Sequence, residues 1–264
     1  MIGCECCIEE RHGIDMMNTG ILLYGMYGYG MGMRGFYFDW TYILVLIGAI
    51  LSIWASARVN STFSKYSRVR SMTGMTGAQT AELILRNAGI RDVRIEHISG
   101  DLTDHFDPRT NTVRLSDSVY NSCSVAAVGV AAHEIGHVIQ HHEDYVPMKV
   151  RSALVPAANI GSRAGVPLII LGVILGYNST LIQIGIWVFS LAVLFQVVTL
   201  PVEFNASSRA LKCLESYGIL STQETGMSRK VLSAAALTYV AAAAASVLQL
   251  LRLVLLFGNN RRRD

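Results

Sequence analysis

Residues 133–137 of the sequence read His-Glu-Ile-Gly-His, a spacing that suits metal-assisted hydrolysis. On a helix, residues four positions apart lie on one face, so His133 and His137 can direct imidazole nitrogens at one ion. Glu134 is then placed to act on a metal-bound water. Two histidines and an ionised glutamate buried as mere core residues would be costly. We therefore interpret the motif as a site for one Zn²⁺ ion, with Glu134 as the catalytic residue.

A catalytic zinc ion takes three protein ligands and keeps one position open. Glu203 is a candidate third ligand, because it is the first acidic residue after the charge-free run from Ala164 to Val202. We expect it to open a helix behind Pro201, where the helix dipole alone would also favour a carboxylate. His141 and His142 are candidates only by proximity, since three ligands in a row on one helix give poor tetrahedral geometry.

Hydrolysis of a peptide bond also needs an electrophile that stabilises the oxyanion. The candidates are Tyr239, Arg209 and His142, and a packing role in an Ala-rich helix is the alternative for Tyr239. His105 either lines the cleft or satisfies the turn around it, and we favour the turn.

The segment that carries the motif, residues 58–160, has the pattern of a mixed α and β region. Residues 78–87 form an amphipathic pattern that Gly89 would end. Alternating polar and apolar residues at 93–96 and at 112–115 predict two strands, separated by turn residues at 107–110. The run from Val125 to His141 predicts an apolar helix around the motif. We expect the strand at 111–115 to be an edge that pairs with extended substrate, with an ordinary interior strand as the alternative.

The composition indicates a protein with segments embedded in a lipid bilayer. Of the 264 residues, 52% are hydrophobic and only 16% are charged, whereas soluble domains carry about 25% charged residues. Such a chain is not disordered. A net charge of +3 without a long basic run gives almost no support for nucleic-acid binding.

The missing charge is concentrated in a few stretches. Trp40–Ala57, Ala164–Val202 and Val231–Leu251 contain no charged residue, and a transmembrane helix needs about 20 mainly apolar residues. We predict a mainly α membrane protein with three or four transmembrane helices and a small α+β, zincin-like catalytic region carrying the HExxH helix. Buried core helices are the alternative.

We expect the chain to be divided into six segments. They are a lead-in at 1–39, partly dispensable, a membrane helix at 40–57, the catalytic region at 58–160, a membrane hairpin at 161–202, a helix with the third ligand at 203–230 and a last membrane helix at 231–258.

Basic residues that flank short loops indicate the side of the membrane. Arg58, Lys65, Arg68 and Arg70 follow the first span and place residues 58–160 in the cytoplasm, within a multi-pass protein of the cell membrane. The arginines at 261–263 contradict this orientation if the last helix crosses the membrane fully, because they would then lie outside the cell. Close to the N-terminus, residues 4–7 read Cys-Glu-Cys-Cys, a cluster without a visible fourth metal ligand.

Several separated motifs together resemble one known family. The segments AAHEIGHVIQH, DHFDPRTNTVRLS, PVEFNASSRA and LTYVAAAAAS are similar to those of the YugP-type neutral zinc metallopeptidases of bacterial membranes, and more distantly to HtpX-type membrane proteases. The resemblance covers nearly the whole chain from about Met17. It implies a gluzincin-like site with His133, His137 and Glu203 on zinc and Glu134 as general base.

One departure from the pattern of related gluzincins concerns the position four residues after the third ligand. An acid that bonds to a zinc histidine is common there, and this sequence has Ser207. Ser207 or Asn205 is the candidate for that bond.

The sequence thus supports two hypotheses. The first is an integral-membrane zinc endopeptidase that acts at the cytoplasmic face on membrane or membrane-proximal polypeptides. The second is a non-catalytic membrane protein that binds zinc or a partner. Glu134 favours the first, because a purely structural metal site needs no base.

Overall fold

A computed structural model of the chain describes residues 39–258, which form two compact units. The first unit contains Ile53–Val150 and Val198–Val240, and the second contains the described residues 39–52, Arg151–Val197 and 241–258. The expectations for the lead-in, its cysteine cluster and the arginines at 261–263 fall outside the described residues.

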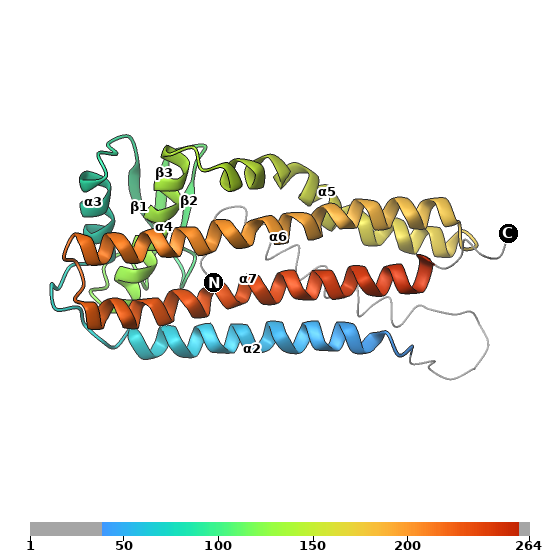
Figure 1. The fold of residues 1–264 in the computed structure, drawn as a ribbon, viewed down its shortest axis with the longest axis horizontal. Coiled ribbons are helices and arrows are strands. Elements are labelled where there is room, and N and C mark those ends of the chain that lie inside the picture. Colours follow the sequence, from blue (N-terminus) through green and yellow to red (C-terminus); the bar gives the residue numbers. More distant parts are fainter. Residues whose placement is uncertain (1–38, 259–264) are drawn as a thin grey trace. The chain divides into compact units, whose positions relative to one another are not determined.

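Four long helices provide the membrane-spanning part of the protein. They are α2 (Tyr42–Tyr66), α5 (Val146–Ile174), α6 (Ser179–Ser216) and α7 (Thr222–Phe257), and each is long and apolar enough to cross a bilayer (Figure 1). Their surfaces expose large apolar side chains such as Ile53 and Trp187, which are 70% and 73% exposed. Such surfaces suit lipid rather than water. The protein is a mainly α membrane protein, as the charge-free stretches predict.

A small α+β region lies between α2 and α5 in the sequence. It consists of α3 (Gly77–Asn87), β1 (Arg94–Ile98), β2 (His105–Asp107), β3 (Thr112–Ser116) and α4 (Val125–His142). Helix α3 begins with a capping box, in which Thr76 and Gln79 each bond the backbone N–H of the other. Gly89, at φ +74°, follows its end as the sequence predicts.

The sheet has the order β1-β3-β2, with β1 parallel and β2 antiparallel to β3 (Figure 1). Our expectation that the strand at 111–115 is a free edge is therefore wrong, because β3 is paired on both sides. The missed element is β2, which is only three residues long. The turn after it folds the chain back: Asp107 accepts hydrogen bonds from the backbone N–H of Arg109 at 2.9 Å and the hydroxyl of Thr110 at 2.7 Å.

Buried acids fix β2 against β3. Asp104 is fully buried and accepts hydrogen bonds from the N–H and the hydroxyl of Ser116. Burial raises the pKa of Asp104 in spite of these bonds. Burial acts in the same direction on Asp107, but the bonds it accepts outweigh it and lower its pKa. His105 lies in β2 with Nδ1 2.9 Å from the carbonyl oxygen of Thr103, so it satisfies the local backbone as we expected.

Helix α4 passes through the core of the first unit. Ser124 caps its start by accepting a hydrogen bond from the N–H of Ala127 at 3.1 Å. Helix α3, β2 and β3 contact α4, and two of its glycines lie against other helices, Gly136 against α6 and Gly129 against α7. Every residue of α4 from Val125 to Val138 is buried. A helix covered from all sides must be apolar all round, which explains why Val125–Ala132, the part before the motif, has no polar side chain.

Helix α6 is continuous from Ser179 to Ser216 with Pro201 inside it. The expectation that a new helix begins behind Pro201 is therefore wrong, and Glu203 does not stand at a helix start. A proline without an N–H leaves the carbonyl of Val197 without its usual partner in the helix. The helix nevertheless continues through Pro201, and the boundary between the two units falls one turn before it, between Val197 and Val198.

In the second unit, α5 and α6 approach each other closely through glycines. A Cβ atom added to Gly185 would lie 2.8 Å from the carbonyl oxygen of Gly165. Only small residues permit such a contact, which is typical of helix pairs in membranes. The tight turn between these helices includes Gly176 and Tyr177, both with positive φ.

Candidate metal centre

Three potential metal ligands converge inside the first unit. The ligand atoms of His133, His137 and Glu203 all lie within 4.8 Å of one another. Nε2 of His133 is 3.3 Å and Nε2 of His137 is 3.6 Å from Oε2 of Glu203. The three side chains are buried, and so is Glu134, which is only 1% exposed.

The close contact between α4 and α6 brings these residues together. The histidines stand one turn apart on α4, and Glu203 faces them from α6 although it is far away in the sequence. Gly136, within the motif, permits this contact, because a Cβ atom there would lie 2.5 Å from the carbonyl oxygen of Ala206. The glycine of the motif thus sets how near the ligands of α6 come to those of α4.

The ligand atoms fit a cation. Oε2 of Glu203 is buried, and within the described part of the chain no donor forms a hydrogen bond with it. A buried carboxylate oxygen that accepts no hydrogen bond is costly. A zinc ion held by two imidazole nitrogens and this oxygen would remove that cost, and two histidines with a glutamate are a known ligand set of catalytic zinc.

The other ring nitrogen of each histidine is also engaged. Nδ1 of His133 lies 3.1 Å from the hydroxyl of Ser207, and Nδ1 of His137 lies 3.0 Å from Oε1 of Gln140. Such outer contacts orient the rings of metal-bound histidines. We expected Ser207 or Asn205 in this role but not Gln140; Ser207 contacts His133, whereas Asn205 contacts Gln140 and Arg209. The signal of Gln140 in the sequence was a polar residue three positions after His137 on an otherwise apolar helix.

Arg209 is connected to the metal centre through Asn205 and Gln140. Its Nε donates a hydrogen bond to Oδ1 of Asn205 at 2.7 Å, and its NH1 donates one to Glu143 at 2.6 Å. The guanidinium also lies 5.8 Å from the centre of the Tyr145 ring. Arg209 therefore ties α6 to the end of α4.

The remaining sequence candidates lie elsewhere. His141 and His142 are not part of the three-residue group. They line a separate cavity of about 220 Å³ together with Phe106 and Val138, and the ring of His141 is 5.7 Å from that of Phe106. Tyr239 is half-buried on α7, and its role in catalysis stays a prediction.

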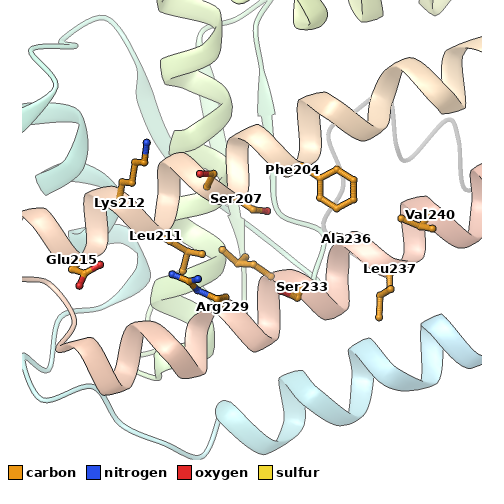
Figure 2. Close-up of a pocket in the computed structure, with 12 residues that line it drawn as sticks. Phe204, Ser207, Leu211, Lys212, Glu215, Arg229, Ser233, Ala236, Leu237 and Val240 are labelled. Atoms are coloured by element: carbon orange, nitrogen blue, oxygen red, sulfur yellow. The ribbon is translucent and has the colours of Figure 1, made fainter.

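A larger cavity of about 560 Å³ lies between α6 and α7 (Figure 2). Phe204 and Val240 line one end, and Lys212 and Arg229 line the other. Ser207 stands between these ends, so the residue that contacts His133 also borders this cavity.

Comparison with known proteins agrees with this geometry. Residues 41–258 match the model of the family described as "Putative neutral zinc metallopeptidase". The chain belongs to this family. It is also 48% identical over 221 residues to "Putative membrane protease YugP" of Bacillus subtilis (strain 168), covering 83% of this chain and 98% of that relative. No solved structure matches.

Membership of this family confirms the resemblance that the sequence motifs suggested. Together with the buried group of His133, His137 and Glu203, it also confirms the zinc cofactor. The chain is accordingly a membrane protein of a zinc metallopeptidase family.

Proposed function

We propose that the chain is an integral-membrane zinc endopeptidase whose active site lies at the cytoplasmic membrane face. His133, His137 and Glu203 hold the zinc ion, and Glu134 is the general base. The observation that carries this proposal is the convergence of the three buried ligand atoms within 4.8 Å, one residue away from a buried glutamate.

The proposed reaction is the hydrolysis of a peptide bond by water. When bound, zinc supplies Lewis-acid chemistry that polarises the carbonyl group and acidifies the water. The carboxylate of Glu134 takes a proton from the attacking water and returns it to the nitrogen of the leaving amine. Tyr239 is the proposed hydrogen-bond donor to the oxyanion. Ser207 and Arg209 support the metal site through their contacts with His133 and Asn205.

The proposed substrates are membrane or membrane-proximal polypeptides. Support comes from the position of Glu203 on α6, directly after the run of residues without charge that ends at Val202. A site placed there is within reach of chains that emerge from the bilayer.

The test of catalysis is the exchange Glu134→Gln in the full chain, purified in detergent. This variant should bind zinc like the parent and lose cleavage of unfolded casein, because glutamine cannot take the proton. The control is Glu82→Gln, which alters an exposed acid of α3 and should leave cleavage unchanged. Cleavage by the Glu134→Gln variant at the parent's rate would mean that the cleavage does not come from this site. It would refute the enzyme hypothesis and favour the alternative, a non-catalytic membrane protein that binds zinc or a partner.

The cytoplasmic orientation has a separate test. Met72 is 83% exposed and lies just after the basic residues that follow α2. In a Met72→Cys variant, an impermeant thiol reagent should add no label over the parent chain in intact cells and should add it after permeabilisation. Labelling of intact cells would place residues 58–160 outside.

A further inference from the structure

Gln140 is a fully buried amide beside the metal centre. A buried amide is costly unless its polar atoms are hydrogen-bonded. Its Oε1 lies 3.0 Å from Nδ1 of His137, and its Nε2 lies 2.8 Å from the carbonyl oxygen of Val202 and 2.9 Å from Oδ1 of Asn205. The amide thus joins the metal-binding face of α4 to the backbone and a side chain of α6.

The direction of this amide follows from its neighbours. The oxygen and nitrogen of an amide look alike and must be assigned from the hydrogen-bond network. The carbonyl of Val202 can only accept, so it requires the nitrogen of Gln140. Arg209 can only donate, so Asn205 turns its oxygen to Nε of Arg209, and the same oxygen accepts from Gln140. Two independent anchors therefore direct Oε1 of Gln140 at His137.

This direction decides which nitrogen of His137 carries the proton. Because Oε1 of Gln140 can only accept, Nδ1 of His137 must donate. A neutral imidazole has one N–H, so Nε2 keeps its lone pair, and Nε2 is the atom that faces Glu203.

We propose that Gln140 is a positioning residue that holds His137 in the tautomer protonated at Nδ1 and so presents Nε2 to the metal. Val202, Asn205 and Arg209 hold Gln140 in turn. The inference rests on the proposed function only in taking Nε2 of His137 as a zinc ligand.

The two histidines differ in this respect. Ser207 meets His133 with a hydroxyl, which can either donate or accept. That contact does not by itself specify a tautomer, whereas the contact from Gln140 does. Removing the acceptor at residue 140 should therefore weaken zinc binding more than Ser207→Ala, and Ser207→Ala serves as the matched control.

The variants that test the proposal are Gln140→Leu and Gln140→Glu. Leucine removes the acceptor, and loss of an outer partner of a metal ligand costs about 10- to 100-fold in metal affinity. Glutamate keeps the acceptor but loses the two donated hydrogen bonds to α6, so this variant should lose less than about 10-fold in zinc affinity and unfold at a lower temperature. If Gln140 served only to pack the two helices, both variants would lose zinc affinity in step with their thermal stability, and the proposal would be wrong.

A direct reading of the tautomer does not depend on the stability of the Gln140 variants. Histidine ¹⁵N spectra of the full-length parent in detergent, before and after zinc is added, distinguish Nδ1–H from Nε2–H, and His137→Asn identifies the signal. Before zinc is added, we expect Nδ1 of His137 to carry the proton. A neutral ring with its proton on Nε2 in place of Nδ1 would overturn the proposal. The outcome of the Glu134→Gln assay does not affect this measurement. The proposed peptidase function and the proposed role of Gln140 can therefore be refuted separately.

Discussion

Gly136 offers the sharpest test of how α4 and α6 build the metal centre. In Gly136→Ala, the new Cβ would lie 2.5 Å from the carbonyl oxygen of Ala206 and 3.2 Å from its Cα. Ordinary contact requires about 1 Å more. The obstacle is backbone, so no side chain can rotate away, and the two helices must separate. Because Glu203 lies one turn before Ala206 on α6, it must move with that backbone.

The size of the effect follows from the tolerance of zinc coordination. Ligand distances in zinc sites hold to within about 0.2 Å, so a shift several times larger breaks the arrangement of the three ligands. We expect Gly136→Ala to weaken zinc binding at least as much as loss of an outer contact does, about 10- to 100-fold. Overpacking should also lower the free energy of unfolding by about 1–3 kcal/mol.

The assay compares zinc dissociation constants and melting temperatures of full-length variants in detergent. Gly226→Ala is the control, because no atom lies within 4 Å of a Cβ added to this glycine of α7. That variant should bind zinc like the parent and gain up to about 1 kcal/mol from helix propensity. If Gly136→Ala bound zinc and melted like the parent, the contact between α4 and α6 would not set the ligand spacing, and the reasoning would fail.

Three further predictions concern other parts of the first unit. Glu203→Ala should lower zinc affinity by more than about 100-fold, the upper end for an outer contact, while Glu215→Ala on the same helix should not; unchanged metal by atomic absorption would move the third ligand elsewhere. The raised pKa of Asp104 means that its favourable contribution to folding is complete below the unfolded pKa, near 4, and declines as pH rises through the folded value. Asp104→Asn, which has no proton to lose, should therefore gain in melting temperature relative to the parent between pH 4 and 7, and a constant difference across this range would contradict the shift. Thr76→Ala should remove the capping box of α3 and cost about 1 kcal/mol in denaturant unfolding, whereas an unchanged midpoint would show that the cap is dispensable.

The sequence predicted most accurately what depends on local pattern. The spacing of His133 and His137, the helix around them and the charge-free stretches each report on a few neighbouring residues. Gly89, which follows the end of α3, was predicted equally well. Glu203 stood out because it follows a long run without charge.

The errors arose where tertiary contacts override local signals. Strand β2 has three residues and no alternation to detect, so its pairing with β3 could not be foreseen, and the free edge was misplaced. Pro201 ordinarily marks a helix boundary, but α6 continues through it. Gln140 carried only a weak signal, its polar side chain three positions after His137, and only the fold shows that its partners are Val202 and Asn205.

The metal ligands become available at different times while the protein is synthesised. His133 and His137 leave the ribosome within one helix, whereas Glu203 follows only after α5 and the apolar part of α6 have been synthesised. Binding by all three residues therefore requires that α6 has already folded beside α4. Because metal binding contributes directly to folding free energy, zinc uptake becomes a late maturation step that favours correctly assembled chains. The segment of residues 58–160, expressed by itself, lacks the third ligand and cannot reproduce the site.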